Sequence, residues 1–266
     1  MQSFSLGNAR TGVVETATHS YQFHLFQPEA PAPGGGWPAL FLLDADGCFA
    51  TAVEALRRMA RRPDATAVTD MVIVGLGPVG GHAPAMRQRD FTTPRSGDDP
   101  TSGGAVDFLR FLRSDMLPMI GRFASIDMRR LTLFGHSLAG YFALWSLFEA
   151  ESPFDRVCAA SPSIWWDQDH LLAGLPHLAG RESHVDILMG EWEGDLPPWQ
   201  AREPDADRVR ARRAERDMIG TARALSERMA AHLPPGHCSF RLLPEEDHAS
   251  LVSAAMPRAL RLASRP

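Results

Sequence analysis

Short apolar runs alternate with longer amphipathic stretches along the chain, a pattern that predicts buried strands alternating with helices. The run 38–43 (PALFLL) is apolar throughout and ends at the turn signal DADG, which is typical of a strand buried on both faces. Residues 21–26 (YQFHLF) instead alternate and precede Pro28, which predicts a strand near a sheet edge. The expected strands are 21–26, 38–43, 71–76, 131–134, 156–160, 185–189 and 239–243.

Helical spacing of apolar residues fills most of the gaps between these strands. The expected helices are 49–59, 103–122, 141–147, 205–232 and 249–263. The polar stretch 77–102 is expected to be a loop, and so long a loop commonly carries function. Buried strands that alternate with helices indicate an α/β protein with a mostly parallel central sheet and helices on both faces. No repeat, linker or charge block divides the 266 residues, so we expect a single domain over 1–266.

One strand-to-helix junction carries a candidate nucleophile. The sequence GHSLA, centred on Ser137, lies between the strand 131–134 and the helix 141–147. This is the arrangement of a nucleophile elbow, in which a sharp turn lifts the serine hydroxyl out of the sheet, with Ala139 in place of the usual final glycine. The helix N-terminus presents free N–H groups, that of Leu138 first, where negative charge would develop. The alternative is a glycine-rich turn with an ordinary serine.

The partners that such a serine needs follow later strands. In α/β-hydrolases the chain order is serine, acid, histidine. His248 follows the strand 239–243 and comes last in this order, which makes it the candidate base; the alternative is a surface histidine. Glu193 is the first candidate for the acid and Glu191 the second, because both follow the strand 185–189. It stays open whether either carboxylate reaches the histidine or the site is a serine–histidine dyad.

Composition narrows the classes of function. The formal net charge of −5 argues against a general nucleic-acid-binding protein. Every basic residue is Arg, and the lack of Lys excludes a Schiff-base lysine and a Walker-A phosphate loop. Cys48, Cys158 and Cys238 have no metal-ligand spacing, so we expect reduced thiols, no metal site and no cofactor. No signal-peptide pattern and no apolar run of about 18 residues occur, so we expect a cytoplasmic protein without a membrane span.

Several motifs together resemble one family. They are LFLLDADGCF, VIVGLG, RQRDFTTP, SGGAVDFLRFLRSDMLPMI, LTLFGHSLAGYFAL, AASPSIWW, LMGEWEGD and DHASL. In this combination the sequence resembles the trilactone siderophore esterases that act on enterobactin and salmochelin, in the putative-esterase branch of the α/β-hydrolase superfamily. The resemblance implies the α/β-hydrolase fold, Ser137 as nucleophile, His248 as base and Arg87 as a substrate contact. The chain departs from the family at Ala45 and Ala139, where glycine is usual, and at DFTTP, where the family tends to have DYTP.

Geometry and the family together suggest the remaining site residues. The oxyanion donors are expected to be the backbone N–H groups of Leu138 and of Asp46, in the turn after the strand 38–43. Arg87 and Arg89 have planar guanidinium groups that suit the anionic oxygens of a catecholate. Three tryptophans follow strands at the same edge of the sheet, where they are placed either to stack on catechol rings or to pack inside the protein. They are Trp165, Trp166 and Trp192.

These observations lead to one main hypothesis and two rivals. The main hypothesis is a serine esterase that hydrolyses the ester bonds of a ferric catecholate trilactone siderophore and so releases iron. The small-molecule siderophore, iron-loaded or iron-free, is then the partner, and the iron arrives with the substrate. The rivals are a carboxylesterase acting on a feruloyl, acetyl or thioester group, and a hydrolase-fold protein that binds a siderophore without turnover.

Overall fold

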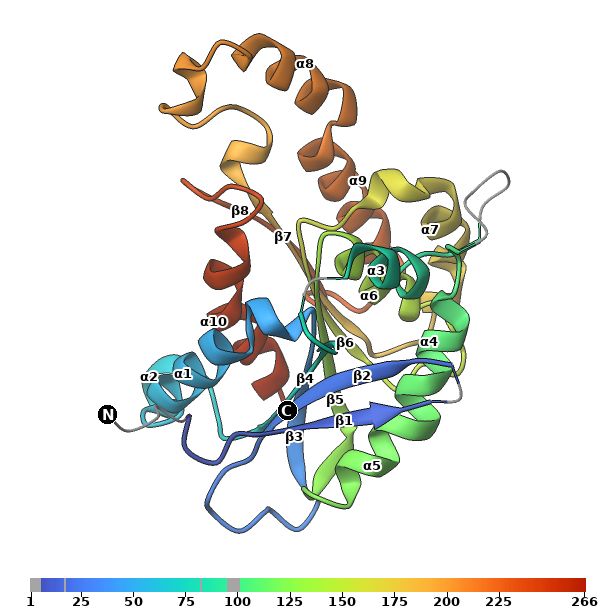
Figure 1. The fold of residues 1–266 in the computed structure, drawn as a ribbon, viewed down its shortest axis with the longest axis vertical. Helices are drawn as coiled ribbons and strands as arrows, with labels where there is room; N and C mark the ends of the chain where they lie inside the picture. The colour runs from blue at the N-terminus through green and yellow to red at the C-terminus, as the bar shows by residue number, and fades with distance from the viewer. Residues whose placement is uncertain (1–5, 17, 82, 95–100) are drawn as a thin grey trace.

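A single eight-stranded sheet runs through the molecule, with helices on both of its faces (Figure 1). The computed structural model describes residues 6–266 except 17, 82 and 95–100. The strand order across the sheet is β1-β2-β4-β3-β5-β6-β7-β8. The strands are β1 (Arg10–Glu15), β2 (Ser20–Phe26), β3 (Trp37–Leu43), β4 (Val72–Pro78), β5 (Ile126–His136), β6 (Arg156–Ala160), β7 (His184–Gly190) and β8 (Cys238–Leu243).

The strand directions identify the fold. β2 is antiparallel to both of its neighbours, whereas β4, β3 and β5 to β8 are parallel to one another. This order and this one reversed strand are those of the α/β-hydrolase fold, which confirms the expected fold class. Residues 21–26 form β2, which lies next to the edge of the sheet as predicted; the edge strand itself is β1, which was not among the expected strands. β1 is largely exposed or half-buried, so its sequence carries no apolar run that would have predicted it.

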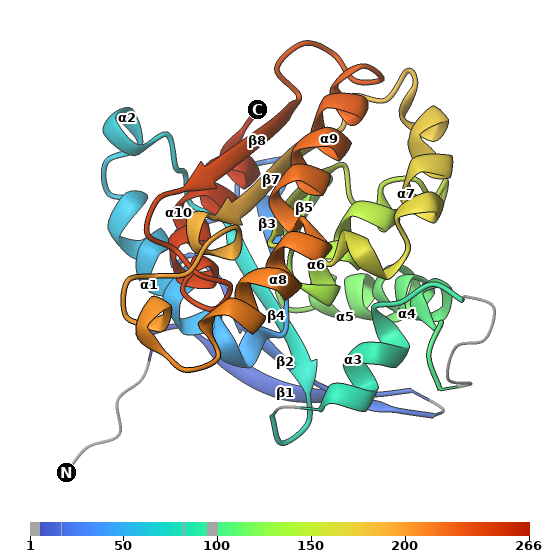
Figure 2. The same ribbon diagram turned by 90° about the horizontal axis from the view of Figure 1, so that it is seen from above.

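The helices divide between the two faces of the sheet (Figure 2). They are α1 (Phe49–Met59), α2 (Pro63–Thr66), α3 (Pro84–Asp90), α4 (Ala105–Phe111), α5 (Leu117–Gly121), α6 (Leu138–Ser146), α7 (Gln168–Gly174), α8 (Ala206–Arg216), α9 (Met218–Ala230) and α10 (Leu251–Ser264). One face packs against α1 and α10 and the other against α4 to α7 and α9. Successive β3 residues alternate between these two cores, Leu40 and Leu42 in one, Phe41 and Leu43 in the other.

Three segments differ from the expected elements. The stretch 77–102, expected to be a loop, contains α3, whose first residue is Pro84. The expected helix 205–232 is divided into α8 and α9 because Asp217 has a left-handed backbone with φ 36°. The expected helix 103–122 contains a turn of π-helix at Leu112–Met116 between α4 and α5.

Helix α8 stands apart from the two cores. It lies beyond the carboxyl ends of the strands, above the sheet (Figures 1 and 2). Its buried residues Ala206 and Val209 pack with Leu196 in a small separate cluster. Among the described residues, no helix is long and apolar enough to cross a membrane.

Candidate active site

Ser137 occupies a strained turn between β5 and α6. Its backbone has φ 59° and ψ −118°, a conformation that costs a non-glycine residue about 1–3 kcal/mol. Neighbouring backbone groups hold it there: the Ser137 N–H donates to the carbonyl of Ala160 at 3.0 Å, and the N–H groups of Ser163 and Tyr141 donate to the Ser137 carbonyl at 2.9 and 3.1 Å. The turn is therefore fixed on both sides, by β6 and by the first turn of α6.

Small residues allow the end of β5 and the start of α6 to approach each other closely at this turn. A Cβ added to Gly135 would clash with the carbonyl oxygen of Ala139, so only glycine fits at 135. Ala139 itself is fully buried, and the close approach involves its backbone rather than its methyl group. The other departure, Ala45, is accommodated similarly: a Cβ added to Gly75 would lie 2.6 Å from the Ala45 Cβ, so Gly75 leaves room for that methyl group.

A chain of hydrogen bonds joins the serine, the histidine and Glu193. Ser137 Oγ lies 3.2 Å from His248 Nε2, and His248 Nδ1 lies 2.7 Å from Glu193 Oε2. A carboxylate only accepts hydrogen bonds, so His248 carries its proton on Nδ1 and presents Nε2 as an acceptor to the serine hydroxyl. This is the geometry in which a base can take the proton of a nucleophile.

Glu193 is almost completely buried, with 6% of its surface exposed. Burial alone would raise the pKa of Glu193, but hydrogen bonds from His248, from the Ser161 hydroxyl and from the Gly190 N–H outweigh it and hold the pKa below its usual value. The carboxylate is thus ionised and fixed in place. Glu191, the second candidate, lies elsewhere: its Oε2 accepts a hydrogen bond from the Glu245 N–H at 2.9 Å.

Two further side chains at the site were not among the predicted residues. Ser163 is buried and its Oγ lies 3.2 Å from Ser137 Oγ. His136 Nε2 lies 2.7 Å from the carbonyl oxygen of His248, and the two imidazole rings are 4.5 Å apart. Burial and the neighbouring His248 lower the pKa of His136 to about 4, so His136 is neutral and donates its Nε2 proton to that carbonyl. The adjacency of His136 to the serine and the ASPS motif were the available signals for these two residues.

Two pockets open from the serine and histidine, and both are lined by Ser137 and His248. The first, which we call the Arg87 pocket, is also lined by Asp44, Asp46 and Arg87. The Arg87 Nε donates to both carboxylate oxygens of Asp44 at 2.9 Å. Asp46 lies in a 3-10 turn directly after β3. The structure therefore brings the predicted residues Arg87 and Asp46 to the same pocket as Ser137.

The second pocket, which we call the α8 pocket, is lined by Trp165, Ser163 and three arginines of α8 besides the serine and histidine. The arginines are Arg212, Arg213 and Arg216. Of the predicted tryptophans, Trp165 is 45% exposed here, whereas Trp166 is partly buried and packs against the main core. Trp192 packs edge-on against Trp199 with ring centres 4.7 Å apart.

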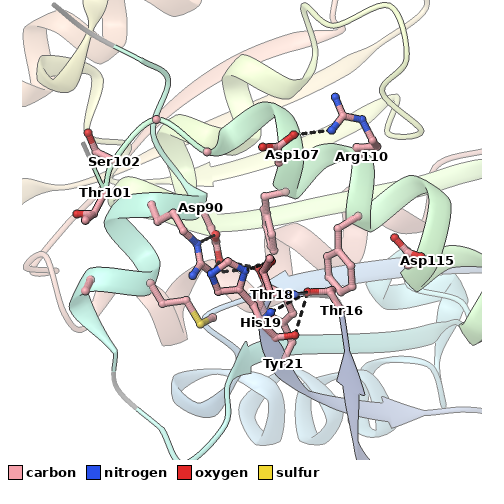
Figure 3. Close-up of a pocket in the computed structure, with 17 residues that line it drawn as sticks. Thr16, Thr18, His19, Tyr21, Asp90, Thr101, Ser102, Asp107, Arg110 and Asp115 are labelled. Atoms are coloured by element: carbon pink, nitrogen blue, oxygen red, sulfur yellow. Dashed lines mark hydrogen bonds and ion pairs between the residues drawn. The ribbon is translucent and has the colours of Figure 1, made fainter. Parts of the chain in front are cut away.

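Arg89 lies in a different part of the molecule. Its guanidinium bonds to the carboxylate of Asp90, which is 3% exposed, and to the hydroxyl of Tyr21. Arg89, Asp90 and Tyr21 line a separate pocket together with residues of α4 (Figure 3). Ser137 and His248 are not among the residues that line it, so the structure does not bring Arg89, expected to bind the substrate, to either pocket at Ser137. Arg89 is held away from Ser137 by the buried Asp90, because a buried carboxylate without a positively charged partner would destabilise the folded protein.

The described residues contain no cluster of three or more His, Cys, Asp or Glu side chains that could hold a metal ion.

Comparison with known proteins gives consistent similarities. The family described as "Putative esterase" matches residues 15–236. Ferri-bacillibactin esterase BesA of Bacillus subtilis is 31% identical, over 99% of this chain and 92% of its own. The siderophore enterobactin esterase of Emericella nidulans is 30% identical, over 85% of this chain and 81% of its own. The crystal structure of BES protein from Bacillus cereus has a TM-score of 0.80 at 29% identity and covers 100% of this chain and 99% of that one. The similarity thus extends over the whole fold rather than over one motif.

Proposed function

Because the chain belongs to the "Putative esterase" family, we propose that it is a serine esterase that hydrolyses the ester bonds of a catecholate trilactone siderophore. One observation carries the chemistry: the hydrogen-bonded series Ser137–His248–Glu193 at the mouths of two pockets. The siderophore substrate is supported by the relatives, which are named as esterases of ferri-bacillibactin, triacetylfusarinine C and enterobactin.

The reaction follows from the geometry of the three side chains. Ser137 Oγ attacks the ester carbonyl carbon while His248 Nε2 takes its proton, and Glu193 stabilises the imidazolium that forms. The same proton then passes to the leaving alcohol as the acyl-enzyme forms. Water, activated by His248, attacks the acyl-enzyme, and its proton returns to Ser137 as the acid departs. Glu193 completes a triad in this scheme, rather than a dyad.

The oxyanion donors proposed for this reaction are backbone N–H groups. Leu138 is the first residue of α6, where N–H groups have no partner within the helix. Asp46 lies in the 3-10 turn that lines the Arg87 pocket. Two such donors from α6 and from the turn after β3 would stabilise the negative charge of the tetrahedral intermediate. Arg87 and Trp165 border the pockets that receive the siderophore, and any iron is part of the substrate.

The substrate class is tested by product analysis. The purified protein is incubated with ferric and iron-free forms of cyclic triester catecholate siderophores and with a siderophore that has no ester bond. We expect the two triesters to yield ring-opened and shorter acids, separated by chromatography, and the ester-free compound to remain intact. Hydrolysis of simple aryl esters without any turnover of the triesters would contradict the siderophore assignment while leaving the esterase chemistry intact.

Glu193→Gln is expected to lower kcat/KM by about 10- to 1000-fold, less than loss of the nucleophile or base, because the amide no longer stabilises the imidazolium. Hydrolysis of p-nitrophenyl acetate measures the effect. Glu191→Gln is the matched control, since Glu191 contacts the Glu245 N–H rather than His248, and its activity should stay within about twofold of wild type. Full activity in Glu193→Gln would instead favour a serine–histidine dyad.

A further inference from the structure

The two pockets beside Ser137 differ in charge. The Arg87 pocket contains two carboxylates, Asp44 and Asp46, and one guanidinium, Arg87. The α8 pocket contains one carboxylate, Glu193, and the three arginines Arg212, Arg213 and Arg216. Glu193 is already bonded to His248, so the arginines face the α8 pocket with a clear excess of positive charge. An anionic group of a substrate is therefore attracted to the α8 side.

Neighbouring arginines on the same helix show that this excess is local. Arg208 pairs with Asp205 at 2.8 Å and Arg210 pairs with Asp207 at 3.1 Å. In the described part of the chain, Arg212, Arg213 and Arg216 form no ion pair with a carboxylate. Arg208 and Arg210 are thus paired with carboxylates at the start of the helix, and Arg210 also with Asp195, whereas the arginines that line the pocket have no ion pair among the described residues.

The three pocket arginines also differ from one another. Arg213 is bound to the protein: it donates to the carbonyl of Asp195 and to the side-chain oxygen of Gln200. Burial lowers the pKa of Arg213, and the adjacent guanidinium of Arg212 lowers it further. A bound anion would reduce the repulsion between these two positive charges. Arg212 and Arg216 are exposed, and the Arg216 guanidinium lies 4.9 Å from the centre of the Trp165 ring. Arg216 and Trp165 together offer a flat, positively charged surface suited to a planar aromatic anion.

Arg87 is less suited to binding an anionic group of the substrate. Its Nε is bonded to both oxygens of Asp44, so its charge is largely balanced within the pocket wall. The side chains of Arg87 and Asp44 are 24% and 26% exposed to solvent. A charge already paired in this way attracts a second anion less strongly than an unpaired one.

We propose that Arg212 and Arg216 of α8, with Trp165, form the subsite that binds an anionic aromatic group of the ester substrate. This deepens the proposed function, because it rests on the esterase chemistry at Ser137 and specifies which side of the site selects the substrate. A catecholate arm of a siderophore is such a group, and so is a benzoate. Arg213 positions the helix by its contacts with Asp195 and Gln200.

The experiment compares anionic and neutral aryl esters and needs no siderophore. p-Nitrophenyl benzoate is compared with the mono-p-nitrophenyl ester of terephthalic acid, and phenyl benzoate with its analogue carboxylated on the phenol ring. The double variant Arg212→Gln/Arg216→Gln is measured against wild type, so that differences in intrinsic reactivity cancel. Arg208→Gln/Arg210→Gln is the matched control on the same helix, and thermal unfolding checks that all variants fold.

We expect the pocket double variant to lower the anionic-to-neutral ratio of kcat/KM by about 10-fold or more for at least one pair, and added salt to reduce the wild-type ratio. The control variant should keep the wild-type ratio. An unchanged ratio in the pocket variant for both pairs would overturn the proposal, as would a larger loss in Arg87→Gln or an equal loss in the control. Failure of the wild type to open siderophores would refute the siderophore assignment and leave this comparison valid.

Discussion

Replacing Ser137 by alanine is expected to lower kcat/KM for ester hydrolysis by about 10³-fold or more, while the protein remains folded. The hydroxyl is the only group that the substitution removes, and it is the group aligned with His248 Nε2 at 3.2 Å. The strained backbone at 137 is held by N–H and carbonyl contacts that alanine also makes. Turnover of p-nitrophenyl acetate and thermal unfolding measure the two effects.

Ser163 provides a matched comparison, because its hydroxyl lies 3.2 Å from that of Ser137. A fluorophosphonate reagent should add to Ser137 in the wild type and in Ser163→Ala, but not in Ser137→Ala, as mass spectrometry of the peptides would show. Near-normal turnover in Ser137→Ala, or labelling of Ser163 in its place, would refute the assignment of the nucleophile.

Replacing His248 by alanine is expected to lower kcat/KM by a similar factor, about 10³-fold or more, because the base and the nucleophile act as one unit. His136 cannot take over the role, since its Nε2 proton is donated to the His248 carbonyl and its ring lies beside that of His248. The sharper test is the double variant Ser137→Ala/His248→Ala. Its activity should match that of either single variant, whereas losses that multiply would show that the two residues act independently.

The sheet and the elbow were predictable from sequence because each depends on a short, local pattern. The run 38–43 is apolar because β3 is buried on both faces, and Ser137 lies where a buried strand meets an apolar helix. β1 escaped prediction because its side chains are largely exposed or half-buried. Helix α3 escaped because its short sequence lies within a stretch rich in glycine and proline.

Which partner each charged side chain contacts at the site could not be predicted from the sequence. Two arginines of one motif, Arg87 and Arg89, lie two residues apart, yet one lines the Ser137 pocket and the other bonds to the buried Asp90. Glu191 and Glu193 are also two residues apart, yet the carboxylate of Glu193 contacts His248 and that of Glu191 contacts the Glu245 N–H. The arginines of α8 belong to a stretch that was expected to be one helix, 205–232, and only the structure shows that three of them line a pocket with His248.

The separate packing of α8 has an evolutionary consequence. The helix is held by the small cluster of Leu196, Ala206 and Val209 and by the hydrogen bonds of Arg213, and among the described residues none of its side chains belongs to the two cores that support the sheet. Substitutions on its inner face can therefore accumulate without disturbing the packing beneath Ser137. With the subsite for an anionic group that we propose on α8, the choice of ester would change by substitutions in this single helix, while the serine, histidine and glutamate of the site stay the same.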